Sequence, residues 1–87
     1  MYKNDSQIIE KIKAGGQARE NALAYLYQNS ELKKRILSLL FYTGAGENKY
    51  EEVLIESLII FDRNVRNGKF EGSSSILTYI YSIAKYY

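Results

Sequence analysis

The 87-residue chain contains no cysteine and no histidine. Without cysteine it has no disulfide and no thiol nucleophile, and without either residue it lacks the usual zinc ligands. Histidine is also the side chain that acts most often as a general acid or base near neutral pH. The composition disfavours catalysis, so we expect a protein that is not an enzyme and uses no cofactor or metal.

Long apolar runs are also missing. Uninterrupted apolar stretches such as residues 39–42 are far shorter than the ~20 residues of a membrane-spanning helix, and no stretch resembles a signal peptide. Hydrophobic residues (46%) and charged residues (25%) are near the averages of globular domains. We therefore expect residues 1–87 to form one folded cytoplasmic domain without membrane contact.

The chain lacks the strong basic excess that is typical of proteins that bind duplex nucleic acid. Its formal net charge is +2. Residues 1–44 carry seven basic and four acidic side chains, whereas residues 45–87 carry five and six. Charge alone therefore indicates no class of partner.

Proline is absent, and the six glycines fall in three places that divide the chain into four helical stretches. These cover residues 5–14, 17–43, 47–67 and the segment that follows the serines at 73–75. Asp5 or Ser6 is expected as the first N-cap, and Gly15 ends the first helix. The second stretch either breaks near residues 29–30, where Ser30 can cap a new helix, or continues as one long bent helix. No run shows the alternation of a β-strand. The predicted fold class is all-α, a compact bundle of four to five helices.

The third helical stretch has two different faces. One narrow arc is apolar and predicts the core side: Tyr50, Leu54, Leu58, Phe61 and Val65. The opposite arc carries Glu52, Glu56 and Arg63, flanked by Ile55 and Ile59 on one side and by Val53 and Ile60 on the other. This outer face is either the thin solvated strip of a small bundle or a docking surface, in which charges set register and apolar flanks supply affinity. A metal site is disfavoured because no third ligand lies nearby in the sequence.

The last helical stretch is rich in tyrosine. Its apolar arc comprises Ile76, Tyr79, Ile80, Ile83, Ala84 and Tyr87, and its other arc comprises Thr78, Ser82, Lys85 and Tyr86, with Tyr81 beside Lys85. Hydroxyls, a cation and rings can contact phosphates and stack on unpaired bases, at ~1–3 kcal/mol per base. Alternatively, tyrosine simply occupies the boundary of the core. No glycine or asparagine stops the helix after Ala84, so we expect the natural sequence to continue.

Three segments in order resemble one known family: "SQIIEKIKAGGQARENALAYLY", "YEEVLIESLIIFDRNV" and "GKFEGSSSILTYIYSIAKYY". They are similar to region 2 of bacterial RNA polymerase sigma factors, in the extracytoplasmic-function (ECF) branch of the sigma-70 family. The first shares the short helix, the glycine turn and the "A-(aliphatic/aromatic)-x-x-L-Y" helix. The second shares the acidic segment, and the third shares the "F-x-G-x-S" segment with its "I-A-K" end. The resemblance covers about residues 6–87 and implies a region 2 fold and a role in transcription initiation.

The resemblance implies that the third helix binds the coiled-coil clamp of the polymerase β′ subunit. Glu52 and Glu56 stand at the family's acidic positions, and Ile55 and Ile59 are their apolar neighbours. Ile55 occupies the position of a family glutamine, so an apolar contact replaces a hydrogen bond there. The implied core-polymerase-binding residues are therefore Glu52, Ile55, Glu56 and Ile59.

The resemblance further implies that the last helix contributes to recognition and melting of the minus-ten promoter element, where non-template bases are flipped. The implied DNA-binding residues are Lys69, Thr78, Tyr81, Ser82 and Lys85. Tyr79 stands where the family often has tryptophan and is expected to be a core ring, and Tyr86 replaces an asparagine.

The family's basic minus-ten reader and its C-terminal helix-turn-helix would follow Tyr87, so we expect the chain to be a piece of a longer sigma factor. An anti-sigma factor is a further partner that the resemblance allows. The alternative is a small helical protein–protein interaction or regulatory domain without DNA binding, which could self-associate through Ile55, Ile59 and Ile60.

Overall fold

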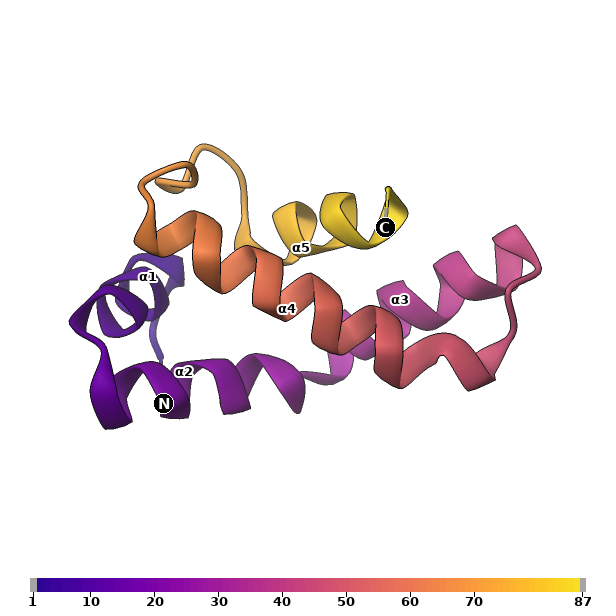
Figure 1. Ribbon diagram of the computed structural model, residues 1–87, viewed down its shortest axis with the longest axis horizontal. Coiled ribbons are helices and arrows are strands. Elements are labelled where there is room, and N and C mark those ends of the chain that lie inside the picture. Colours follow the sequence, from indigo (N-terminus) through magenta and orange to yellow (C-terminus); the bar gives the residue numbers. More distant parts are fainter. Residues whose placement is uncertain (1, 87) are drawn as a thin grey trace.

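The computed structural model describes residues 2–86, and it folds them into five α-helices and one short 3₁₀ helix (Figure 1). They are α1 (Asp5–Ala14), α2 (Gly16–Tyr27), α3 (Ser30–Thr43), η1 (Glu47–Lys49), α4 (Tyr50–Arg66) and α5 (Ile76–Lys85). No strand occurs within this range. The prediction of an all-α bundle of four to five helices is confirmed.

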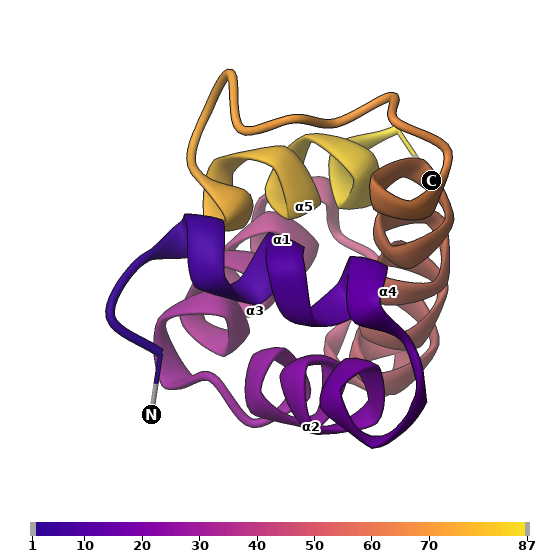
Figure 2. The same ribbon diagram turned by 90° about the vertical axis from the view of Figure 1, so that its left-hand side faces the viewer.

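The long helix α4 runs through the middle of the bundle, and each of the other four α-helices packs against it. Viewed from one end, α1 lies across the bundle, with α2, α4 and α5 arranged around it (Figure 2). Helix α2 also packs against α4, and α3 packs against α5.

The core follows the apolar periodicity of the sequence. Leu54, Phe61 and Val65 of α4 are buried, together with Leu58, and Tyr50 is half-buried, as the arc predicted. The other helices add further fully buried side chains, among them Ile12, Leu26, Leu32, Ile36, Ile76 and Ile80. Each such side chain contributes about 1.5–3 kcal/mol when it leaves water, so these stripes hold the helices together.

Asparagines, and not the predicted residues, cap two of the helices. The Asn4 side chain accepts a hydrogen bond from the Gln7 backbone N–H at 3.1 Å, and Asn29 accepts one from the Leu32 N–H at 2.9 Å. The prediction of Asp5 or Ser6 and of Ser30 as N-caps is therefore wrong by one or two residues. Asn4 and Asn29 have the extended backbone that lets a short side chain turn back onto the first turn.

Three aromatic rings join α4, the connection that follows it and α5. Phe70 stacks on Tyr79 with ring centroids 4.2 Å apart, and Phe61 lies 5.8 Å from Phe70. The Tyr79 hydroxyl accepts a hydrogen bond from the Asn64 side-chain amide at 2.9 Å. Tyr79 is thus a ring of the core boundary, as predicted. Tyr87, placed on the same arc by the sequence, lies outside the described residues.

Two side chains cap the start of α5. Ser75, one of the predicted serines, accepts a hydrogen bond from the Thr78 backbone N–H at 3.1 Å. The carboxylate of Asp5, in the first turn of α1, accepts another from the Ile76 N–H at 2.8 Å. The start of α5 is therefore attached directly to the start of α1.

Candidate functional site

An open groove of about 480 Å³ lies between α2 and α4. Its apolar lining comes from both helices and consists of Leu23, Ala24, Tyr27, Ile55, Leu58 and Ile59. Ile55 and Ile59 are 42% and 53% exposed. Neighbouring exposed aliphatic side chains on a folded surface indicate a place where a partner could bury apolar area. We call this feature the α2–α4 groove.

One end of the α2–α4 groove is basic. Arg19 of α2 donates two hydrogen bonds, at 2.9 and 2.7 Å, to the two carboxylate oxygens of Asp62, and Arg66 pairs with the same carboxylate at 3.0 Å. The hydrogen bonds from Arg19, supported by those from Arg66, hold the pKa of Asp62 below its ordinary value, and Asp62 in turn raises the pKa of Arg19. Arg63 lines the groove too, so the lining contains three guanidinium groups and one carboxylate.

The other part of the α2–α4 groove is bordered by the acidic start of α4. The Tyr27 hydroxyl donates to the carboxylate of Glu51, with oxygen–oxygen distances of 2.7 and 2.8 Å. This hydrogen bond raises the pKa of Tyr27. Glu52 follows in the same first turn, whereas Arg63 and Arg66 lie in the last turn. The groove therefore has an acidic and a basic end, which gives it a direction.

The four predicted core-polymerase-binding residues lie together on the outer side of α4. Glu52, Ile55 and Ile59 are exposed, and Glu56 is half-buried. The structure thus brings them together as the helical periodicity required.

The opposite apolar flank of α4 is not an outer surface. Val53 is buried, in a region that Leu39 and Leu40 of α3 and Ala84 of α5 also line, and Ile60 is half-buried. The prediction of outward apolar shoulders on both sides of the acidic residues is therefore wrong on this side, because α3 and α5 pack there. Of the four apolar residues that flank the acidic ones, Ile55 and Ile59 are the exposed pair.

Four of the five predicted DNA-binding residues share one face of α5. Thr78, Ser82 and Lys85 are exposed and Tyr81 is half-buried, and their spacing of three and four residues aligns them along the helix. Lys69 is exposed but lies outside this face, in the connection between α4 and α5.

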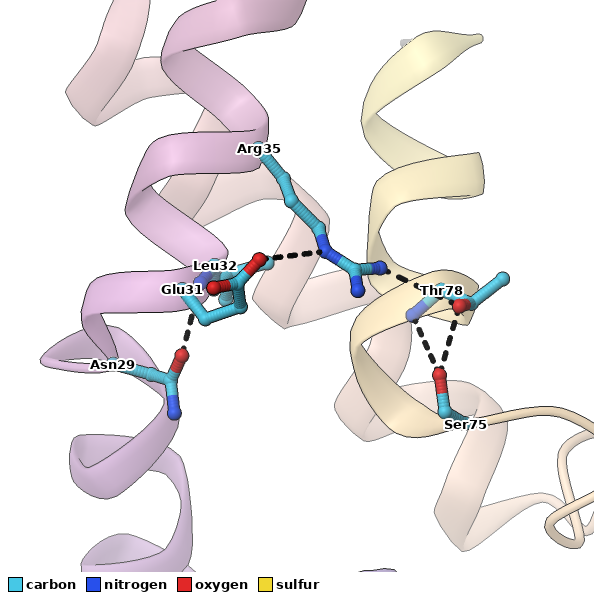
Figure 3. Close-up of polar contacts among 6 residues, drawn as sticks. All are labelled: Asn29, Glu31, Leu32, Arg35, Ser75 and Thr78. Atoms are coloured by element: carbon cyan, nitrogen blue, oxygen red, sulfur yellow. Dashed lines mark hydrogen bonds and ion pairs between the residues drawn. The ribbon is translucent and has the colours of Figure 1, made fainter.

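Sequence reasoning missed the residues of other helices that complete these surfaces. Arg35 of α3 donates to the Thr78 hydroxyl of α5 at 3.4 Å (Figure 3). Arg19 of α2 donates to Asp62 of α4, and each of these two contacts spans 43 residues of sequence. A helical wheel treats each helix separately and contains no such contact. The basic run at residues 33–35 was a usable signal for the first pair.

Residues 2–86 contain no group of three or more side chains that could hold a metal ion. Within the same range, none of the helices combines the length and apolarity needed to cross a bilayer. The chain matches no protein-family model, no curated protein and no solved structure at a significant level. Its surfaces are therefore the basis for assigning a function.

Proposed function

We propose that this chain is a sigma region 2-like domain of a transcription initiation factor, which binds the β′ clamp coiled coil of RNA polymerase through the outer side of α4. The observation that carries the proposal is the exposure of Ile55 and Ile59 beside Glu52 and Glu56, at the edge of the α2–α4 groove. The order of three sigma-like segments in the sequence supports the same assignment.

The chemistry of this surface suits a helical partner. An amphipathic helix binds a groove through apolar side chains spaced by three or four residues. Ile55 and Ile59, four residues apart on α4, offer such a partner helix an apolar surface of matching spacing. Basic side chains of the clamp would pair with Glu52 and Glu56 and fix the register, while the isoleucines supply buried area.

In this proposal α5 binds the nucleic acid. Thr78, Tyr81, Ser82 and Lys85, with Lys69 from the preceding connection, contact the non-template strand of the minus-ten element. The protein acts in the cytoplasm, where its polymerase partner is, and it works by binding rather than by catalysis and needs no cofactor. An anti-sigma factor would regulate it by covering either surface.

Calorimetric titration with a purified β′ clamp coiled coil tests the proposal. The wild-type domain should bind with micromolar or tighter affinity. Glu56→Lys should weaken binding by about 2 kcal/mol, or roughly thirtyfold, because it reverses one charge at the half-buried edge of the interface. Glu10→Lys, the same change on the exposed side of α1, is the control and should bind as the wild type does. A folded wild type that does not bind the clamp would refute the assignment.

The α2–α4 groove also favours a second candidate, a helical interaction module without DNA binding. Tyr27, Ile55 and Ile59 expose apolar surface that a second copy could cover. Such a module would not bind the clamp and would sediment as a dimer. The Ile59→Ser variant would sediment as a monomer. Ile60 contributes less than the sequence suggested, because it is half-buried.

A further inference from the structure

A second groove, of about 380 Å³, lies between α3 and α5. Its lining is Glu31, Lys34, Arg35, Ser38 and Tyr81. The volume is within the ~300–1,000 Å³ of common ligand sites. Because the lining contains no aliphatic side chain, this α3–α5 groove suits a polar and charged ligand and not the apolar face of a helix.

Arg35 spans the α3–α5 groove. Its guanidinium contacts the Glu31 carboxylate at 3.5 Å and the Thr78 hydroxyl at 3.4 Å, and its side chain is 38% exposed (Figure 3). Both distances are at the long limit for hydrogen bonds, so both contacts are weak. Phosphate oxygens accept two parallel hydrogen bonds from a guanidinium and form stronger contacts than these.

The surface around the groove carries excess positive charge. Lys34 and Arg35 line it, and Lys85 lies one turn beyond Tyr81 on the same helix, whereas Glu31 is the acidic residue of the lining. Two cations and one anion give the lining a net charge of +1, and Lys85 adds a third cation beyond it. Hydroxyl donors are also present, from Ser38 in the lining and from Ser82 in the turn after Tyr81.

Tyr81 supplies an aromatic ring to the lining that Lys34 and Arg35 also form. It packs against the core and is half-buried, so one part of the ring is held while the rest borders the groove. An anchored aromatic ring on a cationic groove is the combination with which proteins bind single-stranded nucleic acid, since every base can stack on it.

We propose that a single-stranded nucleic acid crosses from α5 onto α3 through the α3–α5 groove, with Lys34 and Arg35 holding phosphates and a base stacked on Tyr81. The inference rests on the nucleic-acid part of the proposed function and extends it to α3. Duplex nucleic acid does not suit the groove, because its bases are already stacked on each other and only its backbone could meet Tyr81.

Fluorescence anisotropy with labelled oligothymidylate, and with a duplex of equal length, tests this inference over a range of salt concentrations. Phosphate contacts of Lys34 and Arg35, with a third from Lys85, predict a slope of log affinity against log salt of about −2 for a single strand. The double variant Lys34→Gln/Arg35→Gln should reduce the slope to about −0.7. Tyr81→Leu should weaken binding about tenfold with the slope unchanged, and Tyr81→Phe, which keeps the ring, should bind as the wild type does.

The control is Lys11→Gln/Lys13→Gln, which removes the same charge from α1. It should leave the affinity for oligothymidylate and the slope unchanged. An equal loss in the control, equal binding of the duplex, or no binding by the wild type would each overturn the inference. Two further results keep the proposals separate, because the clamp surface is built on α4. Unchanged strand binding by Lys34→Gln/Arg35→Gln overturns only this inference, whereas no strand binding by a wild type that still binds the clamp also overturns the assignment of α5 to nucleic acid. Strand binding without clamp binding overturns only the clamp assignment.

Discussion

At the scale of single residues, the buried carboxylate of Asp62 has the most consequences. It is only 4% exposed, and it is held by Arg19 from α2 and by Arg66 from its own helix. The Arg19–Asp62 ion pair joins α2 to α4 at the basic end of the α2–α4 groove. The spacing of α2 and α4, which form the groove, therefore depends on the charge of Asp62.

Asp62→Asn should lower the free energy of unfolding by about 1–2 kcal/mol at neutral pH. Loss of a buried ion-pair partner costs more when water is excluded, but the arginines are more than a third exposed and water screens the pairs. Because the pKa of Asp62 is lower in the folded state, its contribution is complete above the ordinary pKa and disappears as pH falls through the lowered value.

Urea unfolding of wild type and Asp62→Asn at several pH values measures this contribution. The difference in unfolding free energy should shrink from about pH 4 downwards. A difference that stays constant down to strongly acidic pH would contradict the role of the Asp62 carboxylate. Glu10→Gln, on the exposed side of α1, is a matched control and should change stability little.

Ser57 is a residue whose replacement should raise the free energy of unfolding, in contrast to Asp62. Its side chain is fully buried in α4, and within the described residues its hydroxyl has no hydrogen-bond partner. A buried hydroxyl without a partner costs stability, so Ser57→Ala should raise the free energy of unfolding by about 1 kcal/mol. Ser82→Ala, an exposed serine in a helix, should have only a small effect. Denaturant titration of the two variants distinguishes burial from helix propensity, and a destabilised Ser57→Ala would mean that the hydroxyl has a partner.

At the scale of helices, caps decide where each one begins. Asn29 accepts the hydrogen bond from Leu32, whereas Ser30 is already inside α3. Asn29→Ala should therefore destabilise the protein by about 1 kcal/mol, and Ser30→Ala should be nearly neutral. Thermal unfolding of the pair tests the assignment. Equal effects would mean that Ser30 shares the capping, as the sequence suggested.

The connection between α4 and α5 is held by Phe70, which is buried although it lies outside any helix. Its ring stacks on Tyr79 and contacts Phe61. Phe70→Ala should cost about 3–5 kcal/mol because it leaves a cavity between two helices, while Phe70→Leu should cost less. Denaturant unfolding measures both. A small loss in Phe70→Ala would show that the rings are not needed to place α5.

The existence of the helices was predictable from local sequence, and their contacts were not. Glycines and apolar spacing predicted the helical stretches of the described range, and the capping signal at Ser30 indicated the break between α2 and α3. The 3₁₀ turn at Glu47–Lys49 was absorbed into the third predicted helix, since both share helical local patterns. The burial of Val53 and the pairing of Arg19 with Asp62 depend on which helices become neighbours. The helical wheel of one helix carries no information about its neighbours.

At the scale of the whole molecule, the two proposed surfaces use different pairs of helices. The α2–α4 groove and the α3–α5 groove share no lining residue. Substitutions at distant sites without common partners usually add. We therefore expect Glu56→Lys to leave strand affinity unchanged apart from its effect on net charge, and Lys34→Gln/Arg35→Gln to leave clamp affinity unchanged.

A variant that carries all three substitutions should lose each affinity by the amount measured in the separate variants. Calorimetry with the clamp and anisotropy with oligothymidylate provide the two measurements. A combined loss that differs from these amounts by more than about 0.5 kcal/mol would indicate that α4 and α5 transmit a change between the surfaces.

The contact between Asp5 and Ile76 has a consequence for biosynthesis. These residues are 71 positions apart, and the carboxylate that caps α5 belongs to the first turn of α1. During synthesis, Asp5 therefore leaves the ribosome long before Ile76 is added to the chain. The emerging chain must keep the start of α1 accessible until α5 appears, so this contact closes only after α2, α3 and α4 have been made.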